Sequence, residues 1–250
     1  MHSQLTFQDQ FVAADKDDPA VTISIRESRR ARNLILQAVP PRKVEVVVPR
    51  GTRAATVQAF VREHRDWIAR ASEEMLASYP DAELKPEFID LKAIGEQLRL
   101  RFIETPSTRS SVYYRHGELQ LHCNPSSGWQ PLLRRWLLAQ GRKVLVPWLQ
   151  REAERTGLAP RKTQIRLQKT RWGSCSARGN ISLNAALLLL PPELVRYLLV
   201  HELCHLTHLN HSRRYWQTVG QHEPDYRALD RRLAASWNEL PAWVLATVRH

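Results

Sequence analysis

Cysteine is scarce in this sequence, which argues against a fold held together by disulfides or by a cysteine-bound structural zinc. The 250 residues include three cysteines, Cys123, Cys175 and Cys204. They are too few and too scattered for a disulfide framework or for a ribbon-type zinc site. An apolar content of 43% and a charged content of 25% are instead those of an ordinary globular protein, whose stability comes from a buried apolar core.

Long apolar runs are also missing. No stretch approaches the roughly 20 apolar residues that a membrane-spanning helix needs, so we expect no membrane partner. The first residues, MHSQLTFQDQF, lack the basic start and the apolar run of a secretion signal. Together these absences predict a cytoplasmic protein.

Acidic residues are outnumbered by basic ones. The chain has 37 Lys and Arg against 25 Asp and Glu, a formal net charge of +12. A basic surface attracts nucleic acid, nucleotides or acidic substrates. The alternative is a solvated arginine-rich surface without a specific partner, since no nucleic-acid recognition motif accompanies the charge. Nothing in the sequence indicates an oligomeric state.

One pattern carries clear chemistry, and it reads His201-Glu202-Leu203-Cys204-His205. On a helix, residues four apart lie on one face, so the imidazoles of His201 and His205 can point to one metal ion. Glu202 lies beside that ion rather than on it, where a base for a zinc-bound water is needed. The helix that carries them begins at Pro191-Pro192 and is apolar nearly all round, which predicts that it is buried.

A catalytic zinc usually has three protein ligands, so a third ligand is expected. His208 lies on the same face if the helix continues, but at roughly 10.5 Å along the axis from His201 it converges poorly on one ion. His211 follows Asn210, which tolerates the backbone conformation that ends helices. We therefore predict a chain reversal at Asn210 and assign His211 as the third ligand.

The remaining segments predict a mixed α and β fold. A loose lead-in covers residues 1–18, and His64 is expected to be a packing residue rather than a ligand. Alternation and turn residues predict a small antiparallel sheet with a turn at Pro40-Pro41, and later short strands. Helical spacing of apolar residues predicts three further helices. The strands are expected at 21–25, 34–38, 44–48, 88–91, 98–102, 112–114 and 119–121, and the helices at 52–78, 130–155 and 224–236.

A segment between residues 163 and 185 is expected to lie beside the metal. Residues 163–168 and 180–185 alternate and predict an antiparallel hairpin, with a turn at 176–180. Between them stands Arg-Trp-Gly-Ser-Cys-Ser, from Arg171 to Ser176. Gly173 within a strand indicates a bulge or a close backbone approach. Trp172 is expected either to pack in the core or to contact substrate.

The two motifs together resemble a known family. The run RWGSCSARGNISLN from Arg171, with HELCHLTHLNHSRRYW from His201, resembles the YgjP-like predicted zinc metallopeptidases, relatives of the SprT-like and WLM proteins. The resemblance covers most of residues 20–237. It implies a zincin-like α+β catalytic domain over residues 126–240, preceded by a β-rich α+β region at 19–125 and followed by a tail at 241–250. Tyr215 stands where the family usually has Phe, so its hydroxyl is not expected to be catalytic.

The family likeness implies Zn²⁺ held by His201, His205 and His211, with Glu202 as the catalytic glutamate. We therefore predict a zinc hydrolase, most simply a peptidase acting on a peptide or protein substrate. Such a substrate could add as a strand to the edge of the hairpin.

Several supporting roles remain open at the sequence level. Arg171 or His208 would steady the oxyanion, or Arg171 forms a structural salt bridge. Cys175 and Cys204 are expected to pack rather than to bind metal. Two further residues are candidates for holding a ligand imidazole, His222 and Glu223.

Two other functions are compatible with the same residues. A metal-activated water also attacks phosphorus, so a nucleotide hydrolase is the first alternative. A nucleic-acid-associated module with a structural zinc is the second.

Overall fold

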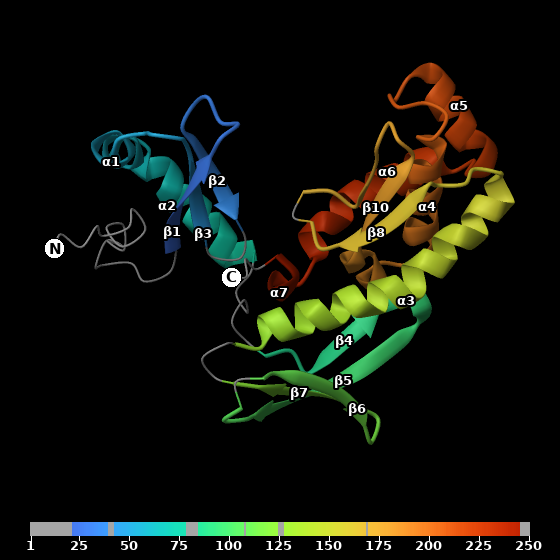
Figure 1. The fold of residues 1–250 in the computed structure, drawn as a ribbon, viewed down its shortest axis with the longest axis horizontal. Coiled ribbons are helices and arrows are strands. Elements are labelled where there is room, and N and C mark those ends of the chain that lie inside the picture. The colour runs from blue at the N-terminus through green and yellow to red at the C-terminus, as the bar shows by residue number, and fades with distance from the viewer. Residues whose placement is uncertain are drawn as a thin grey trace. The chain divides into compact units, whose positions relative to one another are not determined.

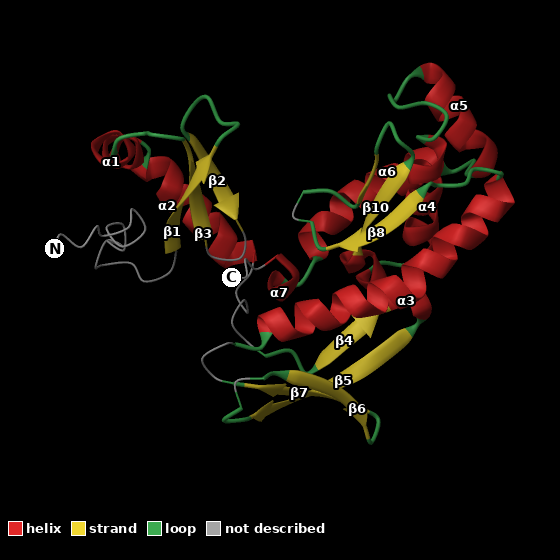
Figure 2. Cartoon of the chain, in the orientation of Figure 1, coloured by secondary structure: helices red, strands yellow, loops and turns green. Residues whose placement is uncertain are grey.

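A computed structural model describes residues 22–39, 43–78, 85–107, 109–124, 128–168 and 170–245 (Figure 1). The predicted lead-in at 1–18 and the Pro40-Pro41 turn lie outside these ranges. The described chain contains both helices and sheets, which confirms the mixed α+β class (Figure 2). Its contacts divide it into two compact units, residues 1–84 with 241–250, and residues 85–240. No described helix is long and apolar enough to cross a membrane.

The first unit contains a three-stranded sheet formed by β1 (Thr22–Ser28), β2 (Ile35–Val39) and β3 (Lys43–Pro49). Strand β2 pairs with β3 antiparallel, but β1 pairs with β3 parallel, so the prediction of a wholly antiparallel sheet is wrong. The reason lies in β3, where five consecutive residues are buried. A strand that is buried on both faces takes the central position, and β1 and β2 then flank it.

Two helices follow in the first unit, α1 (Ala54–Glu63) and α2 (Arg65–Ser78). The prediction of one helix from 52 to 78 is corrected by a break at His64. The backbone N–H of His64 still donates to the Phe60 carbonyl, and its ring Nδ1 lies 2.9 Å from the same oxygen. Its ring also packs on the Phe60 ring at 4.3 Å, so His64 is a packing residue in this structure.

The second unit begins with a four-stranded sheet in the order β4-β5-β7-β6. All four strands lie at or within a few residues of their predicted positions. Helix α3 (Gln130–Thr156) follows as predicted and packs against the sheet on one side and the rest of the unit on the other (Figure 1). The strands are β4 (Phe88–Leu91), β5 (Glu96–Glu104), β6 (Ser111–Arg115) and β7 (Glu118–Cys123), with the 3₁₀ helix η1 (Lys92–Ile94) after β4.

A second, three-stranded sheet has the order β8-β10-β9. Its strands are β8 (Lys162–Arg166), β9 (Gly173–Cys175) and β10 (Asn180–Asn184). The predicted antiparallel hairpin of 163–168 with 180–185 is wrong, because β10 pairs with β8 parallel and with β9 antiparallel. The glycine turn was predicted, but a turn this short joins β10 to the segment directly before it, which is β9.

The chain then forms a group of helices around α4 (Pro192–Cys204). Most of α4 is buried, as predicted, against α3, α6 and β9. Helix α6 (Tyr226–Ala235) matches the predicted helix at 224–236, whereas α5 (Arg213–His222) was not predicted. The other elements are η2 (Ala185–Leu189), η3 (Ser236–Glu239) and α7 (Ala242–Leu245). The division of the chain at residue 125 stays a prediction.

Candidate metal centre

Helix α4 ends earlier than the sequence indicated, and this early end shapes the site. Its last residue is Cys204, and the N–H of His208 donates back to the Cys204 carbonyl in a closing turn. The predicted reversal at Asn210 therefore begins at His205. Residues 205–212 form a loop that ends where the Ser212 hydroxyl accepts the Tyr215 N–H and caps α5.

The loop brings three imidazoles together. The ring nitrogens of His201 and His211 lie 3.3 Å apart, and one ligand atom from each of His201, His205 and His211 lies within 4.8 Å of the others. Two nitrogens bound to one zinc at about 2.05 Å in tetrahedral geometry are about 3.3 Å apart. His211 is exposed and His205 is buried, so the group opens to solvent on one side. The side chain of His208 is not part of this group.

Hydrogen bonds orient two of the three rings. The Nδ1 of His205 lies 2.9 Å from the His208 carbonyl, and an Nδ1–H donated there leaves Nε2 with a free lone pair. The Tyr197 hydroxyl donates to Asp230 at 2.7 Å, and its oxygen lies 3.4 Å from the Nδ1 of His201. An Nδ1–H donated to that oxygen leaves the Nε2 of His201 free to bind a metal.

Aromatic rings enclose the histidines. Tyr215 is fully buried, stacks on His205 at 4.4 Å and donates its hydroxyl hydrogen to the His201 carbonyl at 3.1 Å. Trp216 stacks on His211 at 5.5 Å. The Tyr215 hydroxyl is thus engaged in holding the end of α4, and the rings limit the movement of all three imidazoles.

Glu202 is buried next to the histidines on α4. Its Oε2 has no hydrogen-bond partner among the described residues. Burial raises the pKa of its carboxyl to about 8, and the positive charge of Arg171 opposes part of that rise. Burial also lowers the pKa of His201 to about 3, with smaller contributions from His205 and His211, so this imidazole is in its neutral, ligand-competent form near pH 7.

Strand β9 approaches Glu202 so closely that only glycine fits at position 173. A Cβ on Gly173 would lie 2.5 Å from the Glu202 Oε1. This is the close backbone approach that the sequence predicted. The buried Asn184 fixes the preceding loop, since its side-chain amide donates to the carbonyls of Gln168 and Arg171.

The other predicted residues take varied positions. Arg171 is exposed, but its charge acts on Glu202. Trp172 is buried, and its indole N–H donates to the Leu233 carbonyl at 3.1 Å, which is a packing role. Cys204 is buried, and Cys175 is half-buried, with its pKa raised by burial and then by the charge of Glu202.

Glu223 requires a correction. It was one of two candidates for holding a ligand imidazole, but it is buried and pairs with Arg196 at 2.9 Å and Arg155 at 3.4 Å. His222, its predicted companion, offers its backbone carbonyl to Arg155. The orienting contact to a histidine comes from Tyr197 instead.

Sequence reasoning missed three residues of the site. Tyr197 lies one helical turn before His201, so a search for polar side chains at that spacing on α4 could have found it. Trp216 lies in the motif but on a helix that was not predicted. Asp230 is distant in the sequence, and no local signal marks it.

Comparison with known proteins gives one family match. The model of the YgjP-like family, described as a metallopeptidase domain, matches residues 32–236. No curated protein matches the chain significantly. Among solved structures, the metallopeptidase zymogen of Pyrococcus abyssi abylysin is 26% identical, with 37% of this chain and 94% of that chain covered and a TM-score of 0.34.

Proposed function

Since the chain belongs to the YgjP-like metallopeptidase family, it is a metal-dependent peptidase, and we propose that its metal is zinc, held by His201, His205 and His211. We further propose that residues 126–240 form a zincin-like catalytic domain that follows the region at 19–125. All three histidines and Glu202 lie within that segment.

One observation carries the proposal. Three imidazoles converge beside a buried carboxylate whose Oε2 has no partner within the described chain. A buried polar group without a partner is costly, and a bound cation with its water would satisfy it. Neutral imidazoles are also the ligands that zinc prefers in hydrolases. The donor set therefore fits the metal that the family implies.

The residues of the chain can then be given roles. A zinc ion at the three imidazoles would supply a Lewis acid that polarises the peptide carbonyl and acidifies a water. Glu202 takes the proton of the attacking water and passes it to the leaving nitrogen. Burial raises the pKa of the Glu202 carboxyl to about 8, near neutral pH, where one group can both take up and release a proton. Arg171, whose charge reaches this site, stabilises the oxyanion.

The substrate is proposed to bind along β9. This strand lies at the edge of its sheet and pairs with β10 alone among the described strands, so its other side can accept an extended peptide. Gly173 places that edge directly beside Glu202. A peptide bond held there lies next to both the base and the three imidazoles.

The proposal is tested with zinc-loaded protein and the variant Glu202→Gln. Wild type is expected to contain one zinc and to cleave casein or a mixture of unstructured peptides. Glu202→Gln should keep the zinc and lose activity by at least about 100-fold, since general acid–base catalysis contributes that much or more. Metal content is measured by mass spectrometry. Turnover of nucleotides without peptide cleavage would overturn the peptidase assignment.

A further inference from the structure

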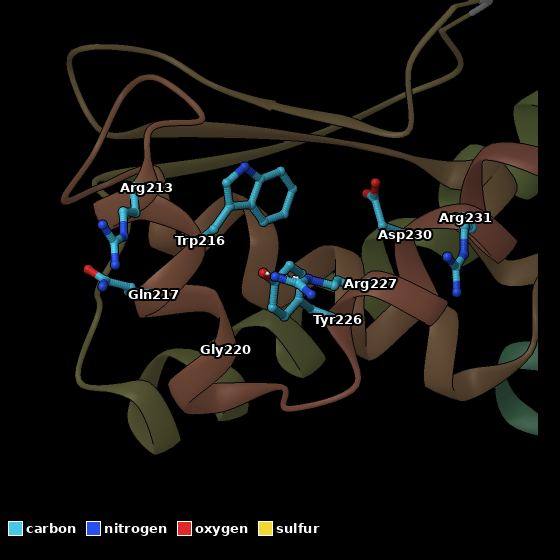
Figure 3. Close-up of a pocket in the computed structure, with 8 residues that line it drawn as sticks. All are labelled: Arg213, Trp216, Gln217, Gly220, Tyr226, Arg227, Asp230 and Arg231. Carbon is cyan, nitrogen blue, oxygen red and sulfur yellow. Dashed lines mark hydrogen bonds between the residues drawn. The ribbon is translucent and has the colours of Figure 1, made fainter.

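A pocket of about 740 Å³ opens between α5 and α6 (Figure 3). Its walls come from one face of each helix, at positions 213, 216, 217 and 220 of α5 and 226, 227, 230 and 231 of α6. Figure 3 shows Arg213 and Gln217 on one side of Trp216 and Asp230 on the other. None of these residues binds the metal or transfers a proton in the proposed bond cleavage, and Trp216 and Asp230 act on it only through His211 and Tyr197.

The pocket adjoins the metal centre through stacked rings. Trp216 stacks on the ligand candidate His211 at 5.5 Å and on Tyr226 at 5.2 Å, with interplanar angles of 27° and 16°. Trp216 also lies 6.0 Å from the His201 ring. A group bound against Trp216 would therefore be separated from the His211 imidazole by one ring, and we take it to belong to the substrate near the cleaved bond.

The lining carries a net positive charge. Arg213, Arg227 and Arg231 are exposed, and in the described parts of the chain none of them forms an ion pair with a carboxylate. Asp230 is the single acidic residue of the lining, so the net charge is +3 − 1 = +2. Its Oδ1 accepts the Tyr197 hydroxyl at 2.7 Å and is thereby committed to orienting His201. The Arg227 Nε donates to the Tyr226 hydroxyl at 3.2 Å, and its guanidinium lies over the Tyr226 ring, but no described carboxylate neutralises any of the three guanidinium groups.

We infer that this pocket binds a carboxylate of the peptide substrate. The carboxylate belongs to an Asp or Glu side chain near the cleaved bond, or to the C-terminus of the peptide. Guanidinium forks match carboxylates in geometry and charge, and the Trp216 and Tyr226 rings can pack against the adjoining methylene groups. The inference deepens the proposed peptidase function and rests on it.

The first test measures cleavage of matched peptides with Glu, Gln or Lys at each position around the cleaved bond. Wild type should prefer Glu over Lys at one position by about three- to tenfold in kcat/KM, as expected for two or three solvated ion pairs. The preference should shrink between low and high salt, because salt screens exposed charges. The doubly substituted Arg213→Glu/Arg227→Glu should invert it.

Arg214→Glu is the matched control for this series. Arg214 lies next to Arg213 on α5 and is also exposed, but it does not line the pocket. This variant should keep the preference of the wild type. An equal effect of Arg214→Glu and Arg213→Glu would assign the preference to overall charge and overturn the pocket.

The second test measures binding without turnover. Zinc-loaded Glu202→Gln is titrated with fluorescent peptides that differ in Glu or Gln, and with the same peptides carrying a free or an amidated C-terminus. Tighter binding of the Glu peptides assigns the pocket to a side chain, and tighter binding of the free acids assigns it to the C-terminus. Either preference should be lost in Glu202→Gln/Arg213→Glu/Arg227→Glu.

The two tests separate the inference from the function it rests on. If the protein cleaves peptides but shows no charge preference in either assay, it is a peptidase and the inference about the pocket is wrong. If the protein cleaves no peptide but still shows a binding preference that depends on the arginines, the peptidase function is wrong and the pocket is an anion-binding site. Displacement of peptides by ATP, with no discrimination between Glu and Gln, would assign the pocket to phosphates and overturn the carboxylate.

Discussion

At the scale of single residues, the absence of a side chain at Gly173 allows the proposed substrate-binding edge of β9 to lie directly beside the proposed base, Glu202. An added Cβ would meet three Glu202 side-chain atoms at 2.5–2.8 Å, so strand or carboxyl must move. We expect Gly173→Ala to lower kcat/KM by at least about 100-fold, since a displacement of a catalytic group by about 1 Å has that effect. We also expect it to lower the free energy of unfolding by about 1–3 kcal/mol, because the added methyl group overpacks the site.

Activity, zinc content and urea unfolding measure the three consequences separately. Ser174→Ala is the control, because Ser174 is on the same strand and points to the opposite face. Retention of zinc with loss of activity is expected. An active Gly173→Ala protein would show that Glu202 does not depend on this approach.

The third ligand is tested by a pair of neighbouring histidines. His211→Ala is expected to lower zinc affinity by several orders of magnitude, because the remaining pair of imidazoles offers an incomplete site. His208→Ala should leave zinc bound, since its backbone carbonyl rather than its side chain contacts His205. Equilibrium dialysis against a zinc chelator measures both. Equal losses in the two variants would contradict the assignment.

Tyr197 is a positioning residue in this structure. Tyr197→Phe removes the oxygen that lies 3.4 Å from His201 Nδ1 and leaves Asp230 without its donor. We expect a loss of about 10–100-fold in zinc affinity, the usual range for partners of metal ligands. Chelator competition measures it, with the exposed Tyr114→Phe as control. An unchanged affinity would assign Tyr197 to packing alone.

At the scale of elements, a buried carboxylate ties three helices together. Glu223 follows α5 and pairs with Arg155 of α3 and Arg196 of α4. We expect Glu223→Gln to lower the free energy of unfolding by about 1–3 kcal/mol, below the full value of a buried pair because both arginines are half exposed. The exposed pair of Glu193 with Arg232 is the control, and Glu193→Gln should cost at most about 1 kcal/mol.

Urea titrations of the two variants provide this comparison. If Glu223→Gln were as stable as Glu193→Gln, the ion pairs would not hold the helices, and their packing would be the sole connection. Zinc content should follow stability, since α4 carries His201 and ends directly before His205.

Elements with a strong local pattern were predictable, and their pairing was not. The spacing of apolar residues located α3, and the His201–His205 pattern located the functional face of α4, because both depend on neighbours within two turns. The pairings of β1 with β3 and of β8 with β10 join strands that are not neighbours in the sequence, and both predictions of their direction were wrong. Helix α5 begins at a serine cap among charged residues and has two buried side chains, so its apolar signal was weak.

The same division applies to the site. His201, Glu202 and His205 are set by helical geometry, and His211 by a short loop, so the sequence brought them into one hypothesis. Asp230 reaches the site only because α6 packs on α4, and periodicity contains no information about that contact. The pocket between α5 and α6 was equally out of reach for this reason.

At the scale of the whole molecule, the net charge of +12 is compatible with nucleic acid or nucleotides as partners, and that partner stays a prediction. The metal has a more specific consequence. All proposed ligands lie in the unit of residues 85–240, so zinc should stabilise that unit and leave residues 22–78 unaffected.

Removal of zinc is therefore expected to act on one part of the chain. A ligand at 100 times its dissociation constant stabilises the folded state by about 2.7 kcal/mol. Its removal lowers the free energy of local opening around the site by up to that amount, and the amides there exchange faster. Amide hydrogen exchange of EDTA-treated protein should quicken at 192–211 and in α5 and α6, while the strands β1 to β3 keep their rates. Treated His211→Ala should show no further change, because its site is already lost. Uniform quickening over both units would mean that the ion stabilises the chain from somewhere other than the three imidazoles.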